Sequence, residues 1–146
     1  MVQDLRNAYN RSFTAEKYVR FLEDLNSRYP GAIDFRVAET PVFVDRSFTK
    51  KILDACETIT DLIISPDFSD KTERAIPAED RVPNETAFPE MIAFDFGICE
   101  NDKGELEPQL IEMQGFPTLV GFQTYYPEVL RKHFPIPEGY SHYLGS

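Results

Sequence analysis

The chain lacks tryptophan and has only two cysteines, Cys56 and Cys99, among its 146 residues. Two isolated cysteines supply neither a disulfide framework nor a zinc site, so we expect reduced thiols and a cytoplasmic protein. The seven glycines are scattered and form neither of the two common glycine-rich phosphate-binding motifs. No apolar run approaches the roughly 20 residues of a membrane span, and residues 1–6 have no apolar signal core.

Basic residues are also few. Fifteen Lys and Arg stand against 25 Asp and Glu, which gives a net charge of −10 at pH 7. The longest basic runs are two pairs, Lys50 with Lys51 and Arg131 with Lys132. Nucleic acids and anionic membrane surfaces both require clustered Lys and Arg, so we expect neither as a partner.

The apolar patterning predicts an α+β fold, with two or three helices packed on a small, mostly antiparallel sheet. The length suits a single domain, residues 1–146, with a core of ordinary size. Thr14 is expected to cap a helix that runs to about Arg28. A second helix is expected to open at Ser47 or Thr49, and Cys56 lies on its apolar face.

Three further segments have a recognisable character. Residues 33–44 are expected to be extended, with Pro41 interrupting any strand or placing it at a sheet edge. Residues 118–133 have helical character, but Pro127 is expected to start a new segment or to kink the helix. Residues 65–89 carry four prolines among alternating charges, which predicts a long loop that is either functional or mobile.

Two pairs of charged residues in these segments could serve a site. Arg74 and Arg81 are the cations of the long loop that could reach an acidic site, a substrate carboxylate or a phosphate. The alternative is a solvated loop with local ion pairs of little energy. For Arg36 and Glu39, in the first extended segment, we expect a surface ion pair.

Residues 91–114 are expected to form a β-hairpin at the centre of the sheet. Its turn lies at residues 101–104, because Asn, Asp and Gly tolerate the positive φ of a tight hairpin. If Asn101 pairs with Gly104, Asp95 and Glu112 become diagonal neighbours on one face, roughly 7–8 Å apart. The same register places Leu110 on the face of Asp95. It places Ile111 on the opposite face, with Phe94.

Asp95, Glu112 and Gln114 would then present three oxygen donors on one rigid face. Two close carboxylates repel unless a cation, a proton or a basic side chain lies between them, and magnesium prefers oxygen ligands. The alternative is an ordinary solvent-exposed sheet face. The small residues Ala93 and Gly97 on this face, and the abrupt turn at residues 115–118, favour a ligand site.

The same hairpin carries a family resemblance. Residues 94–96, a turn containing glycine, residues 110–114 and a Pro-Thr turn resemble a segment of the glutathionylspermidine-synthase-like, circularly permuted ATP-grasp ligases. Those enzymes carry Arg-x-Asp and Glu-x-Asn on adjacent strands, and the Asp, Glu and Asn hold magnesium against the ATP phosphates. Asp95 and Glu112 match the two carboxylates, and Gln114 stands in place of the Asn. Ala93 replaces the Arg that stabilises charge on the transferring phosphoryl group.

Residues 36–44, 73–78 and 110–117 also resemble the opening segment of an uncharacterised bacterial family of related ATP-grasp type. The resemblance implies an amino-terminal part of a longer ATP-dependent ligase, which joins a carboxylate to an amine through an acyl phosphate. Mg²⁺ and ATP would be its cofactors. Asp95, Glu112 and Gln114 would hold the metal, and Gln114, Arg74 and Arg81 would face the nucleotide.

The resemblance assigns no catalytic residue to this chain. The nucleotide-binding lysines of such enzymes lie outside these residues, so we expect the isolated chain to be inactive. The expected partners are a small-molecule substrate or the remainder of a parent chain. The competing hypothesis is a non-catalytic binding or scaffold domain that retains the hairpin for stability.

Overall fold

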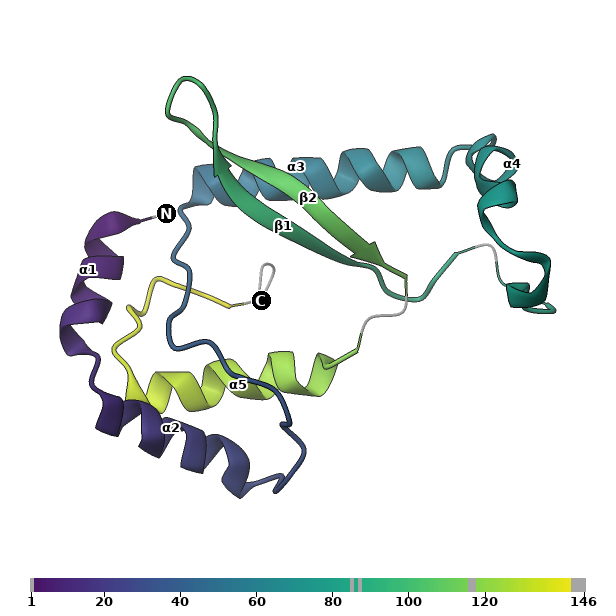
Figure 1. Ribbon diagram of the computed structural model, residues 1–146. Helices are drawn as coiled ribbons and strands as arrows, with labels where there is room; N and C mark the ends of the chain where they lie inside the picture. The colour runs from purple at the N-terminus through teal and green to yellow at the C-terminus, as the bar shows by residue number, and fades with distance from the viewer. Residues whose placement is uncertain (1, 85, 87, 116–117, 143–146) are drawn as a thin grey trace. The chain divides into compact units, whose positions relative to one another are not determined.

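The computed structural model describes residues 2–84, 86, 88–115 and 118–142. These residues form an α+β fold, as the sequence predicts, with five α-helices and a two-stranded antiparallel sheet (Figure 1). The chain groups into two compact units. Residues 1–44 and 119–146 form the helical unit, and residues 45–118 form the hairpin unit. Each unit is described by itself.

The helical unit contains three helices, α1 (Gln3–Ser12), α2 (Ala15–Ser27) and α5 (Val120–His133). The predicted cap of α2 is confirmed, because Oγ1 of Thr14 accepts a hydrogen bond from the Lys17 amide at 3.2 Å. α2 packs against α5, and the two helices lie side by side in Figure 1. The sequence did not predict α1. Its N-cap residue, Val2, offers no side-chain cap, so the usual start signal is missing.

Aromatic and aliphatic side chains fill the core of the helical unit. The buried residues are Tyr9, Phe21, Leu25, Val37, Phe43, Val129, Leu130 and Phe134.

Two tyrosine hydroxyls attach the irregular segment 33–44 to the helices. Tyr9 donates to the carbonyl oxygen of Glu39 at 2.8 Å, and Tyr18 donates to that of Val37 at 2.6 Å. The segment forms no strand and bends at residues 35, 39 and 40, so the sequence expectation of extended structure there gains no support. The two side-chain bonds satisfy backbone carbonyl groups that no sheet ladder pairs.

Helix α5 runs through Pro127, so the new segment expected at this residue does not begin there. Proline has no amide hydrogen, and a proline in a helix interior usually costs about 3 kcal/mol or more. Pro127 is buried, as are Val129 and Leu130 in the same turn. Burial of this apolar turn in the core offsets the lost backbone hydrogen bond.

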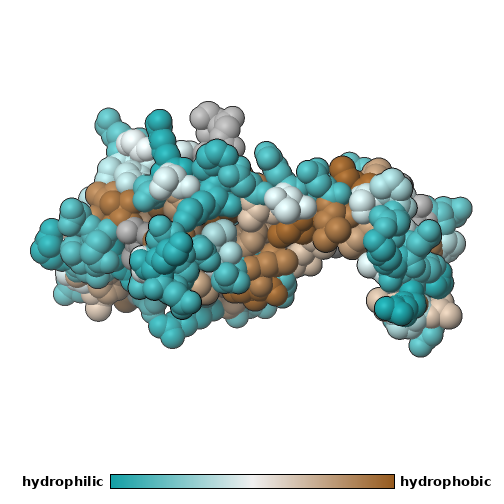
Figure 2. All heavy atoms as spheres, turned by 90° about the horizontal axis from the view of Figure 1, so that it is seen from above, coloured by the Kyte–Doolittle hydropathy of each residue, from teal (hydrophilic) through white to brown (hydrophobic). Residues whose placement is uncertain are grey.

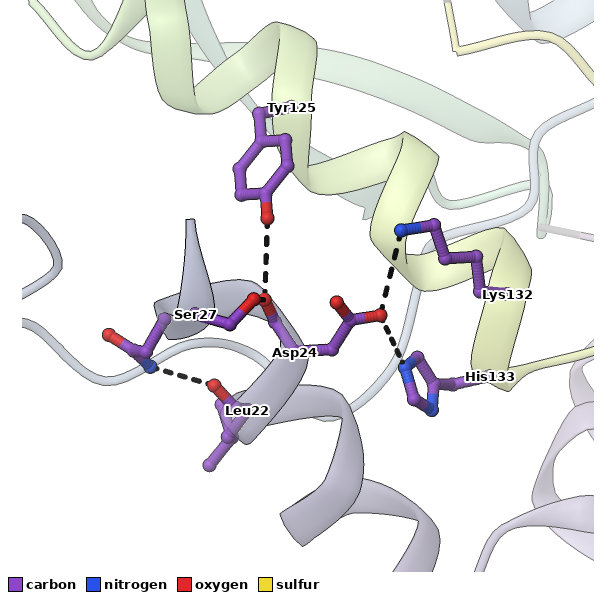
Figure 3. Close-up of polar contacts among 7 residues, drawn as sticks. Leu22, Asp24, Ser27, Tyr125, Lys132 and His133 are labelled. Atoms are coloured by element: carbon purple, nitrogen blue, oxygen red, sulfur yellow. Dashed lines mark hydrogen bonds and ion pairs between the residues drawn. The ribbon is translucent and has the colours of Figure 1, made fainter. Parts of the chain in front are cut away.

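A polar cluster of mostly half-buried residues joins α2 and α5 (Figure 3). Nε2 of His133 lies 3.0 Å from Oδ2 of Asp24, and Nζ of Lys132 lies 3.6 Å from the same oxygen. The hydroxyl of Tyr125 donates to the Asp24 carbonyl oxygen at 3.3 Å. The hydrogen bond from His133, with a smaller effect of the nearby Lys132 charge, lowers the pKa of Asp24. One carboxylate on α2 therefore contacts two basic residues at the end of α5.

The hairpin unit contains α3 (Arg46–Ile63) and the strands β1 (Ala93–Glu100) and β2 (Leu106–Gln114). The predicted second helix exists, but its cap is Asp45 rather than Ser47 or Thr49. The Asp45 carboxylate accepts hydrogen bonds from the Phe48 amide at 2.8 Å and the Ser47 hydroxyl at 2.6 Å. α3 packs on β2, where Nζ of Lys51 donates to the Leu106 carbonyl oxygen at 3.0 Å.

The segment expected to be a long loop contains short helical pieces. They are α4 (Phe68–Thr72) and two 3₁₀ turns, Glu73–Ala75 and Ala78–Asp80. None of these three pieces contains a buried residue. Their local hydrogen bonds, such as that from the Thr72 hydroxyl to the Phe68 carbonyl oxygen at 2.9 Å, therefore support them with little help from packing.

Large apolar side chains remain exposed on the hairpin unit. Among the described residues they include Leu53, Leu62, Ile98, Leu110, Ile111 and Met113. Figure 2 shows patches of brown, apolar surface among teal, hydrophilic residues. No helix in the described ranges has the length and apolar character to cross a membrane.

Candidate metal site on the hairpin

The turn of the hairpin is one residue longer than the sequence suggested. The Asn101 amide donates to the Glu105 carbonyl oxygen at 2.9 Å, so Asn101 pairs with Glu105 and not with Gly104. The Gly104 amide donates to the Asn101 carbonyl oxygen at 2.9 Å, and Gly104 has a φ of +78°. A turn followed by one left-handed residue is the usual three-residue hairpin connection. The Asn101 side chain accepts from the Lys103 and Glu105 amides, each at 3.0 Å, which fixes this geometry.

The register also contains an irregularity that the sequence did not predict. Asp95 pairs with Glu112, but Phe96 pairs with Leu110, so Ile111 is an extra, bulged residue on β2. The longer turn and the bulge together place Asp95 directly opposite Glu112 instead of diagonal to it. The prediction that both lie on one face is confirmed, because directly opposed residues project to the same side of a sheet.

The bulge rearranges the apolar residues of β2. Leu110 lies opposite Phe96 and so joins the face of Phe96, not that of Asp95 as predicted. A Cβ atom added to Gly97 would lie 3.7 Å from Cδ1 of Ile111, so the Ile111 side chain covers Gly97 on the Asp95 side. The predicted place of Ile111 on the Phe94 face is therefore wrong. The small size of Gly97 makes room for the bulge, which explains this glycine without a ligand.

Gln114 completes the group of oxygen-bearing side chains. It lies opposite Ala93 on the face of Asp95 and Glu112, and its Nε2 donates to Oε1 of Glu112 at 2.5 Å. Because the amide nitrogen faces Glu112, the amide oxygen points away and remains an acceptor. Within the described residues no Lys, Arg or His forms an ion pair with Asp95 or Glu112. Both carboxylates are exposed to solvent.

The two arginines proposed for a nucleotide do not contact these carboxylates. Arg81 forms an ion pair with the Glu73 side chain and donates to the Glu73 carbonyl oxygen at 3.4 Å. Arg74 lies in the 3₁₀ turn that contains Glu73 and is exposed. The ion pair expected between Arg36 and Glu39 is confirmed, and the Arg36 side chain is 82% exposed.

No other described part of the hairpin unit adds a ligand. In the ranges that the structure describes, His, Cys, Asp and Glu nowhere form a group of three or more able to hold a metal ion. The site therefore depends on two carboxylates and one amide. Cys56 is half-buried, and burial raises the pKa of its thiol, as suits a packing residue rather than a nucleophile. Phe116 and Pro117, in the turn expected after Gln114, lie outside the described residues.

The helical unit contains a cavity of about 510 Å³ that the sequence did not predict. Its walls come from residues 28–33, around the end of α2, and residues 119–128, in the first turns of α5. These segments are far apart in the chain, so no motif spacing could join them. The only local signal is the density of aromatic residues in these two segments, which is equally typical of core packing.

In comparisons with protein-family models, curated proteins and solved structures, the chain matches none of them.

Proposed function

We propose that the hairpin unit is the metal-binding part of an ATP-grasp-type carboxylate–amine ligase, in which Asp95, Glu112 and Gln114 hold Mg²⁺ against the phosphates of ATP. The observation that supports this proposal is the direct opposition of Asp95 and Glu112 on β1 and β2. Like charges that face each other across a hairpin destabilise it. A divalent cation bound between them converts that repulsion into attraction.

The chemistry of the three side chains suits magnesium. Magnesium takes oxygen ligands, keeps several waters, and is commonly held by one or two carboxylates together with substrate phosphates. Asp95 and Glu112 supply the two carboxylates, and the Gln114 amide oxygen supplies a third, neutral donor. The exposed position of both carboxylates leaves room for a phosphate on the open side of the ion.

The role that we assign to the hairpin unit is to hold and orient the metal. The metal, when bound, supplies charge neutralisation at the phosphates. Ala93, which lies opposite Gln114, has no charge to stabilise a transferring phosphoryl group. We therefore assign the phosphoryl transfer to residues outside this chain, in the remainder of a parent protein.

Nucleotide binding with and without metal tests the proposal. ATP affinity should be measured by NMR titration, with and without Mg²⁺, for the wild-type chain, Glu112→Gln and Glu57→Gln. Glu57 lies on α3 and is exposed, so Glu57→Gln makes the same charge change at a residue outside the two strands. Mg²⁺ should strengthen ATP binding to the wild type and to Glu57→Gln, but not to Glu112→Gln. An equal gain in all three proteins would overturn the proposal.

A further inference from the structure

The cavity of the helical unit has the dimensions of a small-molecule site. Its volume of about 510 Å³ lies within the roughly 300–1,000 Å³ typical of ligand pockets. Every residue that lines it belongs to the helical unit, so its walls do not depend on the hairpin unit. The cavity and the carboxylates of the hairpin are therefore independent features of the chain.

Aromatic rings form much of the cavity wall. Tyr29 and Tyr125 meet edge to face, with ring centroids 5.6 Å apart and an interplanar angle of 84°. Phe122 lines the cavity one turn before Tyr125, and it is itself held against Phe35 at 5.1 Å and Tyr126 at 5.4 Å. Rings fixed by other rings keep their orientation, so this wall is preorganised to receive a flat apolar group.

Arg28 provides a cationic group at the same wall. Its guanidinium carbon lies 5.4 Å from the Tyr29 ring centroid and 5.7 Å from that of Tyr125. Both distances are within the range of a cation–π contact. In the part of the chain that the structure describes, Arg28 forms no ion pair with a carboxylate. A guanidinium has five N–H donors in a planar fork that matches a carboxylate, and the ring contacts leave these donors for a ligand.

Glu128 limits the charge that the cavity can accept. It lines the cavity three residues after Tyr125, and residues at this spacing are neighbours on a helix surface. Its carboxylate repels a second negative charge on any ligand that already places one at Arg28. The lining thus favours a single negative charge over the two carried by a phosphate monoester.

We propose that this cavity binds small aromatic monocarboxylates, with the ring against Tyr29 and Tyr125 and the carboxylate on Arg28. The apolar residues Ile33 and Leu119 extend the wall for the rest of the ligand. This site is separate from the metal site proposed on the hairpin.

Three ligands that share one shape and differ in charge test the proposal. The probes are 3-phenylpropionate, 3-phenylpropan-1-ol and 3-phenylpropylamine, each titrated into the whole chain and followed by ¹H–¹⁵N correlation spectra. The carboxylate should give saturable shifts that centre on residues 28–33 and 119–128. It should bind at least about tenfold more tightly than the alcohol, because a hydrogen bond to a charged group is stronger than one between neutral groups. The amine should bind most weakly.

Arg28→Gln and Arg20→Gln supply the matched pair of variants. Arg20 lies on α2, is exposed and does not line the cavity, so its replacement makes the same charge change elsewhere on the helix. Arg28→Gln should weaken binding of 3-phenylpropionate about tenfold or more and leave the alcohol unchanged, while Arg20→Gln should leave both unchanged. The correlation spectra also report whether each variant is folded. Equal affinity for the carboxylate and the alcohol, equal effects of the two substitutions, or shifts centred away from the cavity would each overturn the proposal.

Discussion

Asp95 lies directly opposite Glu112 across the hairpin, and no basic side chain in the described ranges forms an ion pair with either carboxylate. Facing like charges destabilise an antiparallel pair of strands. The sequence of the hairpin thus retains a repulsive contact where a neutral pair would be more stable. A bound cation would remove this repulsion, so the stability of the hairpin unit should depend on divalent metal.

Asp95→Asn should therefore stabilise the metal-free chain. Removing one of two facing charges is expected to raise the free energy of unfolding by about 0.2–1 kcal/mol. Urea denaturation in the presence of a chelator measures this change. Glu57→Gln is the control for the general effect of a less negative chain. If Asp95→Asn gave no more stability than this control, the facing carboxylates would not repel measurably.

Tyr18→Phe should destabilise the helical unit. Its hydroxyl donates to the Val37 carbonyl oxygen at 2.6 Å, and the substitution removes that donor without creating a cavity. The loss should be about 0.5–1.5 kcal/mol, the usual net value of a hydrogen bond. Tyr29 is half exposed, and its hydroxyl donates to no group in the described ranges, so Tyr29→Phe should change stability far less. Thermal and urea unfolding of both variants would check this, and equal losses would contradict it.

The contact between Asp24 and His133 should make stability depend on pH in acid. The pKa of Asp24 is lowered in the folded chain, chiefly by the hydrogen bond from His133. Its contribution is therefore complete above the unfolded pKa of about 3.9 and is lost as pH falls through the lower, folded pKa. The stability difference between the wild type and Asp24→Asn should therefore shrink as the pH falls below about 4. Asp34→Asn, at an exposed carboxylate of the same unit, should show no such loss.

The isolated chain should not hydrolyse ATP above the blank. Ala93 supplies no charge for a transferring phosphoryl group, and removal of such a preorganised group alone typically lowers turnover about 10²–10³-fold. Phosphate release in the presence of Mg²⁺, small carboxylates and small amines measures this directly. Turnover well above the blank, stimulated by those substrates, would contradict the assignment of phosphoryl transfer to residues outside this chain.

Local signals in the sequence predicted the elements of the fold better than their register. Asn and Gly at residues 101–104 specify a tight turn, and Thr14 specifies a helix start, because each acts through bonds to its own neighbours. The pairing of Asn101 with Glu105 and the bulge at Ile111 depend on how the two strands pack. Alternation along a single strand cannot reveal an inserted residue, so the predicted ladder was shifted.

Tertiary packing explains the other differences. α1 has no side-chain cap, and it is positioned by the buried Tyr9 ring, whose hydroxyl bonds to Glu39 thirty residues away. Pro127 remains helical because it is buried in a turn that also places Val129 and Leu130 in the core. The cavity beside Arg28 arises only when α2 and α5 meet. The sequence could name Asp95, Glu112 and Gln114, because the longer turn and the unpredicted bulge shift the register in ways that offset each other, and these residues stay on one face.

The most direct test of the metal site is manganese titration followed by paramagnetic broadening of ¹H–¹⁵N correlation spectra. Mn²⁺ accepts the same oxygen ligands as Mg²⁺. We expect broadening centred on Asp95, Glu112 and Gln114, which should be lost in Glu112→Gln and retained in Glu57→Gln. Binding should weaken in acid as the carboxylates are protonated. Broadening that centres elsewhere, or that survives Glu112→Gln unchanged, would show that this pair of carboxylates does not bind the metal.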